Sequence, residues 1–379
     1  ALATPPGRAA LAVIRMSGPS ALAIAGRCFR GRHTPGETPG GRVLYGTVTD
    51  DAGGVIDDVL LSLFRGPASF TGEDTVELSC HGNPLIVSRI LARLLALGAR
   101  PAAAGEFTRR AWTNGRLDLA RAEAVDEVIR ASSQAALRGA RGRLDGRLSE
   151  KVETLRAALR EAGSLLELEL DFAQEDVEFV PRAALHEKLA AIVAELTRLI
   201  DSYRYGRVIR DGIHVAIVGP PNVGKSSLLN YFLKENRAIV SHLPGTTRDL
   251  IREEFELDGL LFILSDTAGL RESDDPVERE GVRRSRERIR EADLVLLLSE
   301  PGQKTAALEA DVHGLAAGVP VLKVCNKTDL GPAPQDQLGI SLLEGTGLDA
   351  LLARIREAAL GGWHYSEEGA LIASARHRD

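Results

Sequence analysis

The sequence predicts a multidomain protein that combines α/β domains with an all-α domain. With 379 residues, the chain is too long for one ordinary core, and two or three domains are expected. Its middle part carries apolar residues at three- and four-residue steps, which indicates helices. From residue 208 onward, apolar strand-like runs alternate with helical stretches, and this alternation indicates a doubly wound, mainly parallel sheet.

The N-terminal domain, residues 1–115, is predicted to be an α+β unit. Its strand-like segments are "ALAVIRMSG", "VLYGTVTD", "DDVLLSLF" and "DTVELSCHG". The turn "DDAGG" joins the second of these to the third. "PSALAIAGRCF" and "PLIVSRILARLLALG" are predicted helices, and the second has one apolar face made by Ile86, Ile90, Leu94 and Leu97.

The helical domain is predicted to comprise residues 116–207 and 362–379, with residues 208–361 inserted as a separate domain. An apolar stripe runs along its longest segment through Leu185, Leu189, Ile192, Leu196, Leu199 and Tyr203. The acidic segment "LLELELDFAQEDVEFV" lies between two helical stretches. It is predicted to be a solvated linker.

The composition is that of a soluble globular protein, with 44% hydrophobic and 26% charged residues. No apolar run reaches the roughly 18–20 residues that a membrane-spanning helix needs, and no signal-peptide pattern follows Ala1. Cys28, Cys80 and Cys325 are far apart and lack metal-site spacing, so buried thiols in a reducing compartment are expected. These features predict a cytoplasmic protein without a membrane partner.

The net charge of −6 neither requires nor excludes a nucleic-acid partner. Two arginine clusters are present, and a solvated helix face is the simpler interpretation of both. They comprise Arg138, Arg141, Arg143 and Arg147, and then Arg283, Arg284, Arg286, Arg288 and Arg290.

"GPPNVGKSS", residues 219–227, matches the pattern GxxxxGK[ST]. It follows the strand-like "HVAIV" and precedes the helical "SLLNYFL", which is the context that makes the pattern specific for a phosphate-binding loop. The glycines let backbone N–H groups surround phosphates. Lys225 is predicted to reach the β- and γ-phosphates, and Ser226 to bind Mg²⁺. The predicted contacts of this loop are Asn222, Val223, Gly224, Lys225, Ser226 and Ser227.

"NKTD", residues 326–329, follows the strand-like "VPVLKVC" and predicts specificity for guanine. Asp329 would accept hydrogen bonds from guanine N1–H and the exocyclic amine, which adenine does not offer. "SLLEGTG" is also predicted to approach the base, although many GTPases have alanine in the place of its first leucine. The predicted base contacts are Asn326, Lys327, Asp329, Ser341, Leu342 and Leu343. Together with the phosphate-binding loop, they predict a Ras-like P-loop GTPase domain.

Two further motifs are predicted to sense the γ-phosphate. "DTAG" closes a strand-like run and predicts that Asp266 supports the Mg²⁺ shell, whereas "GTTRD" predicts that Thr247 binds Mg²⁺. Leu270 follows the glycine of "DTAG", where many regulatory GTPases have the glutamine that orients water. Another group must therefore orient water. The predicted contacts in these loops are Ser241, His242, Leu243, Pro244, Gly245, Thr246, Thr247, Asp266, Thr267, Ala268 and Gly269.

Several long segments narrow this class of GTPases. "ALATPPGRAALAVIRMSG", "SFTGEDTVELSCHGNP", "PAAAGEFTRRAWTNGRLDLARAEAVDEVI" and the inserted GTPase domain closely resemble the MnmE (TrmE) family of tRNA-modification GTPases. The resemblance covers nearly the whole chain. It implies a homodimer, joined through N-terminal domains that bind 5-formyl-tetrahydrofolate or a related one-carbon folate.

The resemblance also implies a partner, the flavoprotein MnmG (GidA), which carries FAD. With that partner the family adds an aminomethyl or carboxymethylaminomethyl group to C5 of the wobble uridine, position 34, of certain tRNAs. The family ends in a "C-[apolar]-G-K" signature that this sequence does not contain, and none of the three cysteines is expected to replace it.

The resemblance places the folate contacts on Arg15, Glu77 and Arg116. Arginines suit the pterin carbonyl or the glutamate carboxylates, and Glu77 suits paired N–H donors of the pterin. The alternative for Arg116 is a helix-entry ion pair with Asp118.

The resemblance also implies a K⁺ ion held by Asn222, Ser241, the Leu243 carbonyl and Thr246. A turn cap is the alternative for Asn222. Glu278 is implied to orient the attacking water, and Lys225 and Thr247 are the other catalytic groups. The alternative for Glu278 is a solvent-exposed residue at the start of a helix.

Two other functions stay open at the level of sequence. The chain could be a ribosome-assembly GTPase that acts as a binding switch. It could also be a folate-dependent transferase in which GTP is only regulatory.

Overall fold

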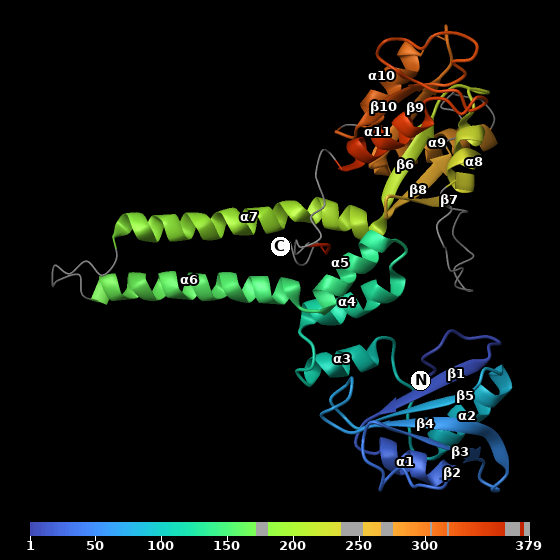
Figure 1. Cartoon of the computed structure of the whole chain (residues 1–379), viewed down its shortest axis with the longest axis vertical. Helices are drawn as coiled ribbons and strands as arrows, with labels where there is room; N and C mark the ends of the chain where they lie inside the picture. Colours follow the sequence, from blue (N-terminus) through green and yellow to red (C-terminus); the bar gives the residue numbers. More distant parts are fainter. Residues whose placement is uncertain are drawn as a thin grey trace. The chain divides into compact units, whose positions relative to one another are not determined.

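The computed structural model describes residues 1–171, 181–235, 253–266, 276–303, 305–316, 318–360 and 372–374. They form two compact units, Ala1–Asp126 and Glu127–Asp379 (Figure 1). Helix α4 (Leu119–Arg130) crosses the boundary between them. Within these described ranges, no helix is long and apolar enough to cross a membrane.

The first unit is built on a five-stranded, fully antiparallel sheet of order β1-β5-β4-β3-β2. The strands are β1 (Leu11–Ser17), β2 (Phe29–Gly31), β3 (Arg42–Thr49), β4 (Val55–Phe64) and β5 (Thr75–His81). One face is covered by α1 (Ala21–Cys28) and α2 (Pro84–Ala96), whose apolar sides share a core with the strands. Helix α3 (Glu106–Thr113) follows α2.

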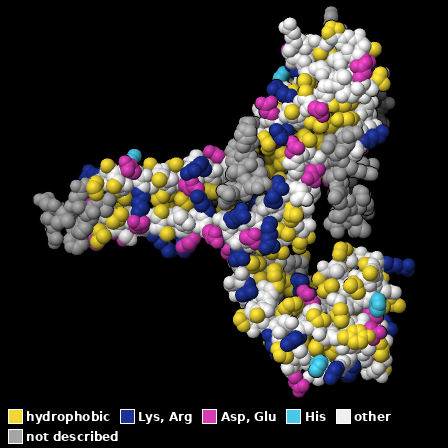
Figure 2. All heavy atoms as spheres, in the orientation of Figure 1, with side chains coloured by type: hydrophobic (Ala, Val, Ile, Leu, Met, Phe, Trp, Pro, Cys, Tyr) yellow, Lys and Arg dark blue, Asp and Glu magenta, His cyan; other side chains and the backbone are white. Residues whose placement is uncertain are grey.

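The other face of this sheet carries exposed apolar side chains. Val43, Tyr45 and Leu60 are 60%, 70% and 47% exposed, and Tyr45 lies directly opposite Leu60 in the register. Figure 2 shows hydrophobic side chains at the surface of this unit.

The predicted strands and helices of this unit are present, and β2 is an addition. The predicted helix "PSALAIAGRCF" ends at Cys28, and Phe29 pairs with Val48 instead. The reason is tertiary: a Cβ on Gly46 would lie 2.6 Å from the Phe29 ring and 2.2 Å from the Arg30 carbonyl oxygen. Only glycine in β3 lets this short strand approach so closely.

The second unit begins with helices. They are α5 (Gln134–Leu144), α6 (Arg147–Asp171) and α7 (Arg182–Asp211). Helices α6 and α7 pack side by side (Figure 1), and ion pairs of Lys151 with Glu195 and of Lys188 with Glu161 link them. The predicted acidic linker begins at residue 165, but α6 ends only at residue 171, so that the first part of this segment is helical. The rest of that segment lies outside the described residues.

Helix α7 leads directly into a six-stranded sheet of order β11-β10-β9-β6-β8-β7, in which β7 alone is antiparallel to its neighbour. The strands are β6 (Ile213–Val218), β7 (Glu253–Leu257), β8 (Leu260–Asp266), β9 (Leu294–Ser299), β10 (Val321–Cys325) and β11 (Leu338–Gly339). The helices are α8 (Lys225–Glu235), α9 (Pro276–Glu291), α10 (Ala306–Leu315) and α11 (Leu348–Leu360). The predicted doubly wound, mainly parallel sheet is confirmed.

Alternate residues of β6 enter two different cores. Val215 and Ile217 pack in one core with α8 and α11, whereas Ala216 and Val218 pack in another core with α9 and α10. Since successive side chains of a strand point to opposite faces, helices cover both faces of this sheet. Continuous apolar strands such as "LVLLL" are expected in such a sheet.

The described C-terminal residues 372–374 return to α7. The Ile372 N–H donates to Ser202 Oγ at 3.1 Å, and a Cβ on Gly206 would lie 2.1 Å from the Ile372 carbonyl oxygen. The chain thus leaves α7 for the sheet, and residues 372–374 contact the same helix again.

Candidate functional site

The phosphate-binding loop lies between β6 and α8, at the carboxyl end of the central strand. Asn222 and Gly224 have left-handed backbone conformations, with φ of 64° and 98°, and such residues let successive N–H groups point inward. The Lys225 ammonium donates to the carbonyl oxygens of Gly219 at 2.9 Å and Pro220 at 2.8 Å. It therefore lies across the loop, where phosphate oxygens would offer it stronger, charged acceptors.

Asn326 ties this loop to the predicted base site. Its amide nitrogen donates to the Val223 carbonyl at 2.8 Å, and its amide oxygen accepts from the Leu342 N–H at 3.3 Å. A Cβ on Gly224 would lie 2.4 Å from that amide nitrogen, so glycine is required there on steric grounds as well as by its φ. Asn326 is 3% exposed, and burial makes the loss of either bond costly.

Asp329 is the second anchor of the base site. Ser341 Oγ donates to Asp329 Oδ1 at 2.6 Å, which fixes the carboxylate and leaves Oδ2 for a ligand. Lys327, with φ of 61°, is held by Glu300 through an Nζ–Oε2 distance of 2.7 Å. The structure therefore brings the predicted base residues together around the ends of β10 and β11, except that the Leu343 side chain is 85% exposed.

The remaining predicted GTP residues are less fully placed. Ser226 and Ser227 are exposed in the first turn of α8, Asp266 is the last residue of β8, and Glu278 lies in the first turn of α9. The predicted contacts that lie outside the described residues are Ser241, His242, Leu243, Pro244, Gly245, Thr246, Thr247, Thr267, Ala268 and Gly269.

A second candidate site lies in the first unit, where Arg15 and Glu77 are direct partners in the β1–β5 register. Arg15 Nε and Nη2 both lie 2.6 Å from Glu77 Oε1. The Arg15 guanidinium also lies 5.9 Å and 5.6 Å from the ring centroids of Phe70 and Phe107, within the range of cation–π attraction. The side chain is thus held before any ligand arrives.

Arg116 lies against the loop 69–74, to which Phe70 also belongs. A Cβ on Gly72 would lie 3.2 Å from Arg116 Cγ, so the aliphatic part of Arg116 lies against that glycine. The Asn114 amide donates to the Thr71 carbonyl at 2.7 Å, which joins the end of α3 to the loop. The Arg116–Asp118 ion pair is not formed in this described region; Asp118 Oδ1 accepts from the Arg121 N–H at 2.9 Å instead.

A charged network fixes α3 against the loop. The Glu106 carboxylate is 3% exposed and accepts from Arg100 Nη1 at 3.0 Å, Arg110 Nη2 at 2.9 Å and the Ala103 N–H at 2.8 Å. Hydrogen bonds from Arg100, Ala103 and Arg110 hold the pKa of Glu106 well below its usual range. Arg110 Nη1 also donates to Glu73 Oε2 at 2.8 Å. Neither Glu106 nor Arg110 was singled out from the sequence, although both lie in the quoted segment "GEFTRRAW".

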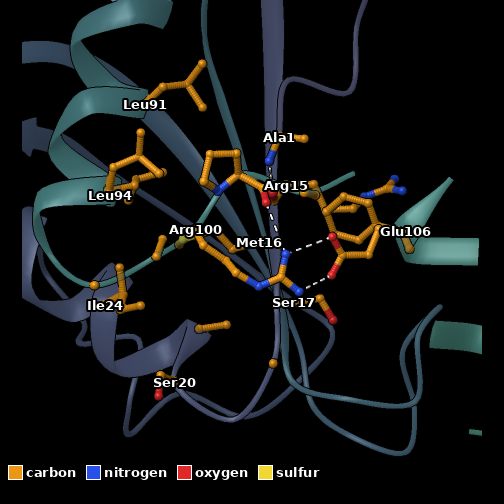
Figure 3. Close-up of a pocket in the computed structure, with 18 of the residues that line it drawn as sticks. Ala1, Arg15, Met16, Ser17, Ser20, Ile24, Leu91, Leu94, Arg100 and Glu106 are labelled. Carbon is orange, nitrogen blue, oxygen red and sulfur yellow. Dashed lines mark hydrogen bonds and ion pairs between the residues drawn. The ribbon is translucent and has the colours of Figure 1, made fainter. Parts of the chain in front are cut away.

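A cavity of about 400 Å³ opens beside Arg15. Figure 3 shows Ile24, Leu91 and Leu94 on one side of it, and the bonded pair of Arg100 and Glu106 on the other. Its lining is therefore mostly apolar, with the Arg100–Glu106 pair on one side.

Comparison with known proteins finds relatives that match along the whole chain. A model of the N-terminus of the GTP-binding protein TrmE matches residues 1–116, and a model of the MnmE helical domain matches residues 119–379. The tRNA modification GTPase MnmE of Chlorobium chlorochromatii is 45% identical over 399 residues, which cover 100% of this chain and 84% of that protein. The protein of the same description from Bordetella petrii is 43% identical over 386 residues, with the same coverage of both chains.

Proposed function

This chain belongs to the MnmE family of tRNA modification GTPases. From that premise we propose that it is a K⁺-stimulated GTP hydrolase that modifies tRNA. With a flavoprotein partner of the MnmG (GidA) type, which carries FAD, it adds an aminomethyl or carboxymethylaminomethyl group to C5 of wobble uridine. A one-carbon folate, 5-formyl-tetrahydrofolate or a relative, would supply the carbon, the reduced flavin of the partner would supply the two electrons that a formyl carbon needs to become a methylene, and a separate amine substrate would supply the nitrogen. No observation favours the ribosome-assembly alternative.

The observation that carries the proposal is the hydrogen bond from Ser341 to Asp329, beside which Asn326 joins Leu342 to the phosphate-binding loop. Asp329 keeps one carboxylate oxygen clear of Ser341, and guanine offers two adjacent N–H donors to such a carboxylate. A nucleotide with a different base would leave this polar group unpaired, which is the basis of strong discrimination.

The chain's own residues then divide the work of hydrolysis. When GTP binds, the Lys225 ammonium would leave the carbonyls of Gly219 and Pro220 and bind the β- and γ-phosphates. The hydroxyl groups of Ser226 and Thr247 would bind Mg²⁺, and Asp266 would support the Mg²⁺ shell. Mg²⁺ and K⁺, when bound, supply positive charge beside the transferring phosphoryl group. The donors proposed for K⁺, at Asn222, Ser241, Leu243 and Thr246, are all neutral oxygens, which suit a monovalent cation.

Glu278 is proposed to orient the attacking water. The side chain of Leu270 has no polar atom for this purpose, and α9 begins only two residues before Glu278. An oriented water attacks the γ-phosphorus, and the bond to the β–γ bridging oxygen breaks, which leaves GDP and phosphate.

Folate binding is supported by the donor and acceptor groups around loop 69–74. Both guanidinium contacts of Arg15 go to Glu77 Oε1, so that, in this described region, Glu77 Oε2 stays available for N–H donors of a pterin. Arg116 offers a guanidinium for the carbonyl or carboxylate groups of the same ligand. The apolar cavity beside Arg15 extends the surface that a long, partly aromatic ligand could cover.

A homodimer through residues 1–115 is proposed as the state in which GTP is hydrolysed. The uncovered sheet face with Val43, Tyr45 and Leu60 supports it, because an exposed apolar patch is typical of a protein–protein interface.

The test compares GTP hydrolysis in KCl and in NaCl at equal ionic strength. We expect turnover to be at least about tenfold faster in KCl, and equal rates would contradict the K⁺ proposal.

Nucleoside analysis of tRNA incubated with the chain, folate and the flavoprotein tests the proposed tRNA modification. Modification that proceeds equally without this chain would contradict it.

A further inference from the structure

We propose that the C-terminal end of α3 is a docking surface for the unpaired anticodon loop of the tRNA substrate. The surface, called the α3 surface below, consists of Arg109, Trp112 and Arg116. This inference rests on the proposed function and names where the RNA meets the proposed folate site.

All three residues lie in the C-terminal part of α3 or directly after it. Arg109 and Trp112 are three residues apart in α3 and are therefore neighbours on the helix surface. Beyond them the chain reverses: the Gly115 N–H donates to the Trp112 carbonyl at 3.0 Å and the Arg116 N–H to the Ala111 carbonyl at 2.8 Å. With Gly115 at φ of 69°, this is a Schellman motif, and it brings Arg116 back beside the last turn.

Trp112 differs from the neighbouring aromatic residues in its contacts. Trp112 and Phe70 are 47% and 41% exposed, but the rings of Phe70 and Phe107 lie 5.9 Å and 5.6 Å from the Arg15 guanidinium, whereas Trp112 has no such ring or cation contact among the described residues. A large exposed indole is costly in water unless a partner covers it.

The cations of α3 have different roles. Arg110 is bound to Glu73 and Glu106 and holds the helix in place. Arg109 and Arg116 are exposed, and within the described residues their guanidinium groups have no ion pair or hydrogen bond. The α3 surface therefore offers an exposed indole and two arginines whose guanidinium groups are unpaired among the described residues.

These groups match single-stranded RNA. Unpaired bases stack on aromatic side chains and on guanidinium planes, while arginines neutralise the adjacent phosphates. A wobble uridine must also leave the loop stack before its C5 can be attacked. Because Arg116 belongs both to the α3 surface and to the proposed folate site, RNA bound to this surface would come close to the one-carbon donor.

Trp112 itself gives a direct signal. The chain has two tryptophans, Trp112 and Trp363, so that the full-length Trp363→Phe protein reports on Trp112 alone. We expect an anticodon stem–loop RNA to quench this fluorescence, and a fully paired duplex of the same length to quench it far less.

Substitutions test the contacts. Trp112→Leu is expected to weaken stem–loop binding by at least about tenfold and Trp112→Phe to restore most of it, because stacking needs an aromatic ring. Arg109→Gln is expected to lower the slope of log affinity against log salt by about 0.7. The matched control is Arg32→Gln, which follows β2 at the opposite edge of the sheet. Because the GTP site lies in the other unit, an unchanged circular dichroism spectrum and an unchanged thermal unfolding transition show that the first unit of each variant is folded.

The results that would overturn the inference are distinct. Equal quenching by duplex and stem–loop, or wild-type affinity in Trp112→Leu, removes the stacking role. Quenching by 5-formyl-tetrahydrofolate but not by RNA would assign Trp112 to the cofactor instead. None of these results depends on GTP hydrolysis or K⁺, so the inference can fail while the proposed function stands.

Discussion

Asp329→Asn gives the sharpest test of the guanine site. In the structure, Asp329 Oδ1 accepts a hydrogen bond from Ser341 Oγ at 2.6 Å, which holds the carboxylate and leaves Oδ2 without a protein partner among the described residues. Asparagine has nearly the same shape, but it replaces one acceptor by a donor and removes the charge. The substitution therefore changes the chemistry that the base meets without creating a cavity.

The magnitude follows from the bonds that guanine would lose. Hydrogen bonds to a charged group contribute about 1.5–3 kcal/mol each. Two of them therefore amount to roughly 3–6 kcal/mol, which corresponds to about 10²–10⁴ in Kd. Xanthine carries a carbonyl where guanine has its amine, so that it offers the substituted side-chain amide a donor and an acceptor in the matching order. Affinity for xanthosine triphosphate should rise as affinity for GTP falls.

The assay is a titration of fluorescent GTP and xanthosine triphosphate into the full chain. Asp336→Asn is the matched control, because Asp336 is in the same loop region but forms an exposed ion pair with Lys323 at 3.0 Å, and such pairs contribute little. If Asp329→Asn binds GTP within about threefold of the wild-type chain, or gains no affinity for the xanthine nucleotide, the assignment of this carboxylate is wrong.

Three further predictions concern both sites. Glu278→Ala should lower kcat for GTP by about 10² with little change in GTP affinity, because only the oriented water is lost; an unchanged kcat in stopped-flow phosphate release would refute this. Arg15→Ala should weaken folate binding by about 10- to 100-fold in calorimetry, while Arg42→Ala binds normally and both hydrolyse GTP; wild-type folate affinity would argue against the site. Since the pKa of Glu106 is lowered in the folded state, its stabilising effect is present above its ordinary pKa of 4.5 and is lost as the pH falls toward the lowered value. Unfolding followed by Trp112 fluorescence in the Trp363→Phe chain should therefore show the largest difference between wild type and Glu106→Gln near neutral pH, and a difference that is the same at every pH would contradict the role of the charge.

The GTPase half of the fold was predictable because its signals are local. The strand, the glycine-rich turn and the helix around Lys225 stand next to one another in the chain, and "NKTD" directly follows the strand that positions it. The bond between Asn326 and the Val223 carbonyl joins residues far apart in sequence, so it could not be predicted from spacing. The short strand β2 was missed for the same reason, since it depends on Gly46 in another strand.

In α3, the sequence does not predict which side chains are fixed in the fold and which are exposed. "TRRAW" contains two adjacent arginines, and no local rule separates them. Their difference arises from the orientation of the helix about its axis: Arg110 faces Glu73 in the loop 69–74, and a step of one residue turns Arg109 about 100° away from it. That orientation is set by the Glu106 network and by the Asn114 bond to Thr71, which are tertiary contacts. The same contacts that fix Arg110 in the fold therefore leave Arg109 and Trp112 on the surface, where a ligand can meet them.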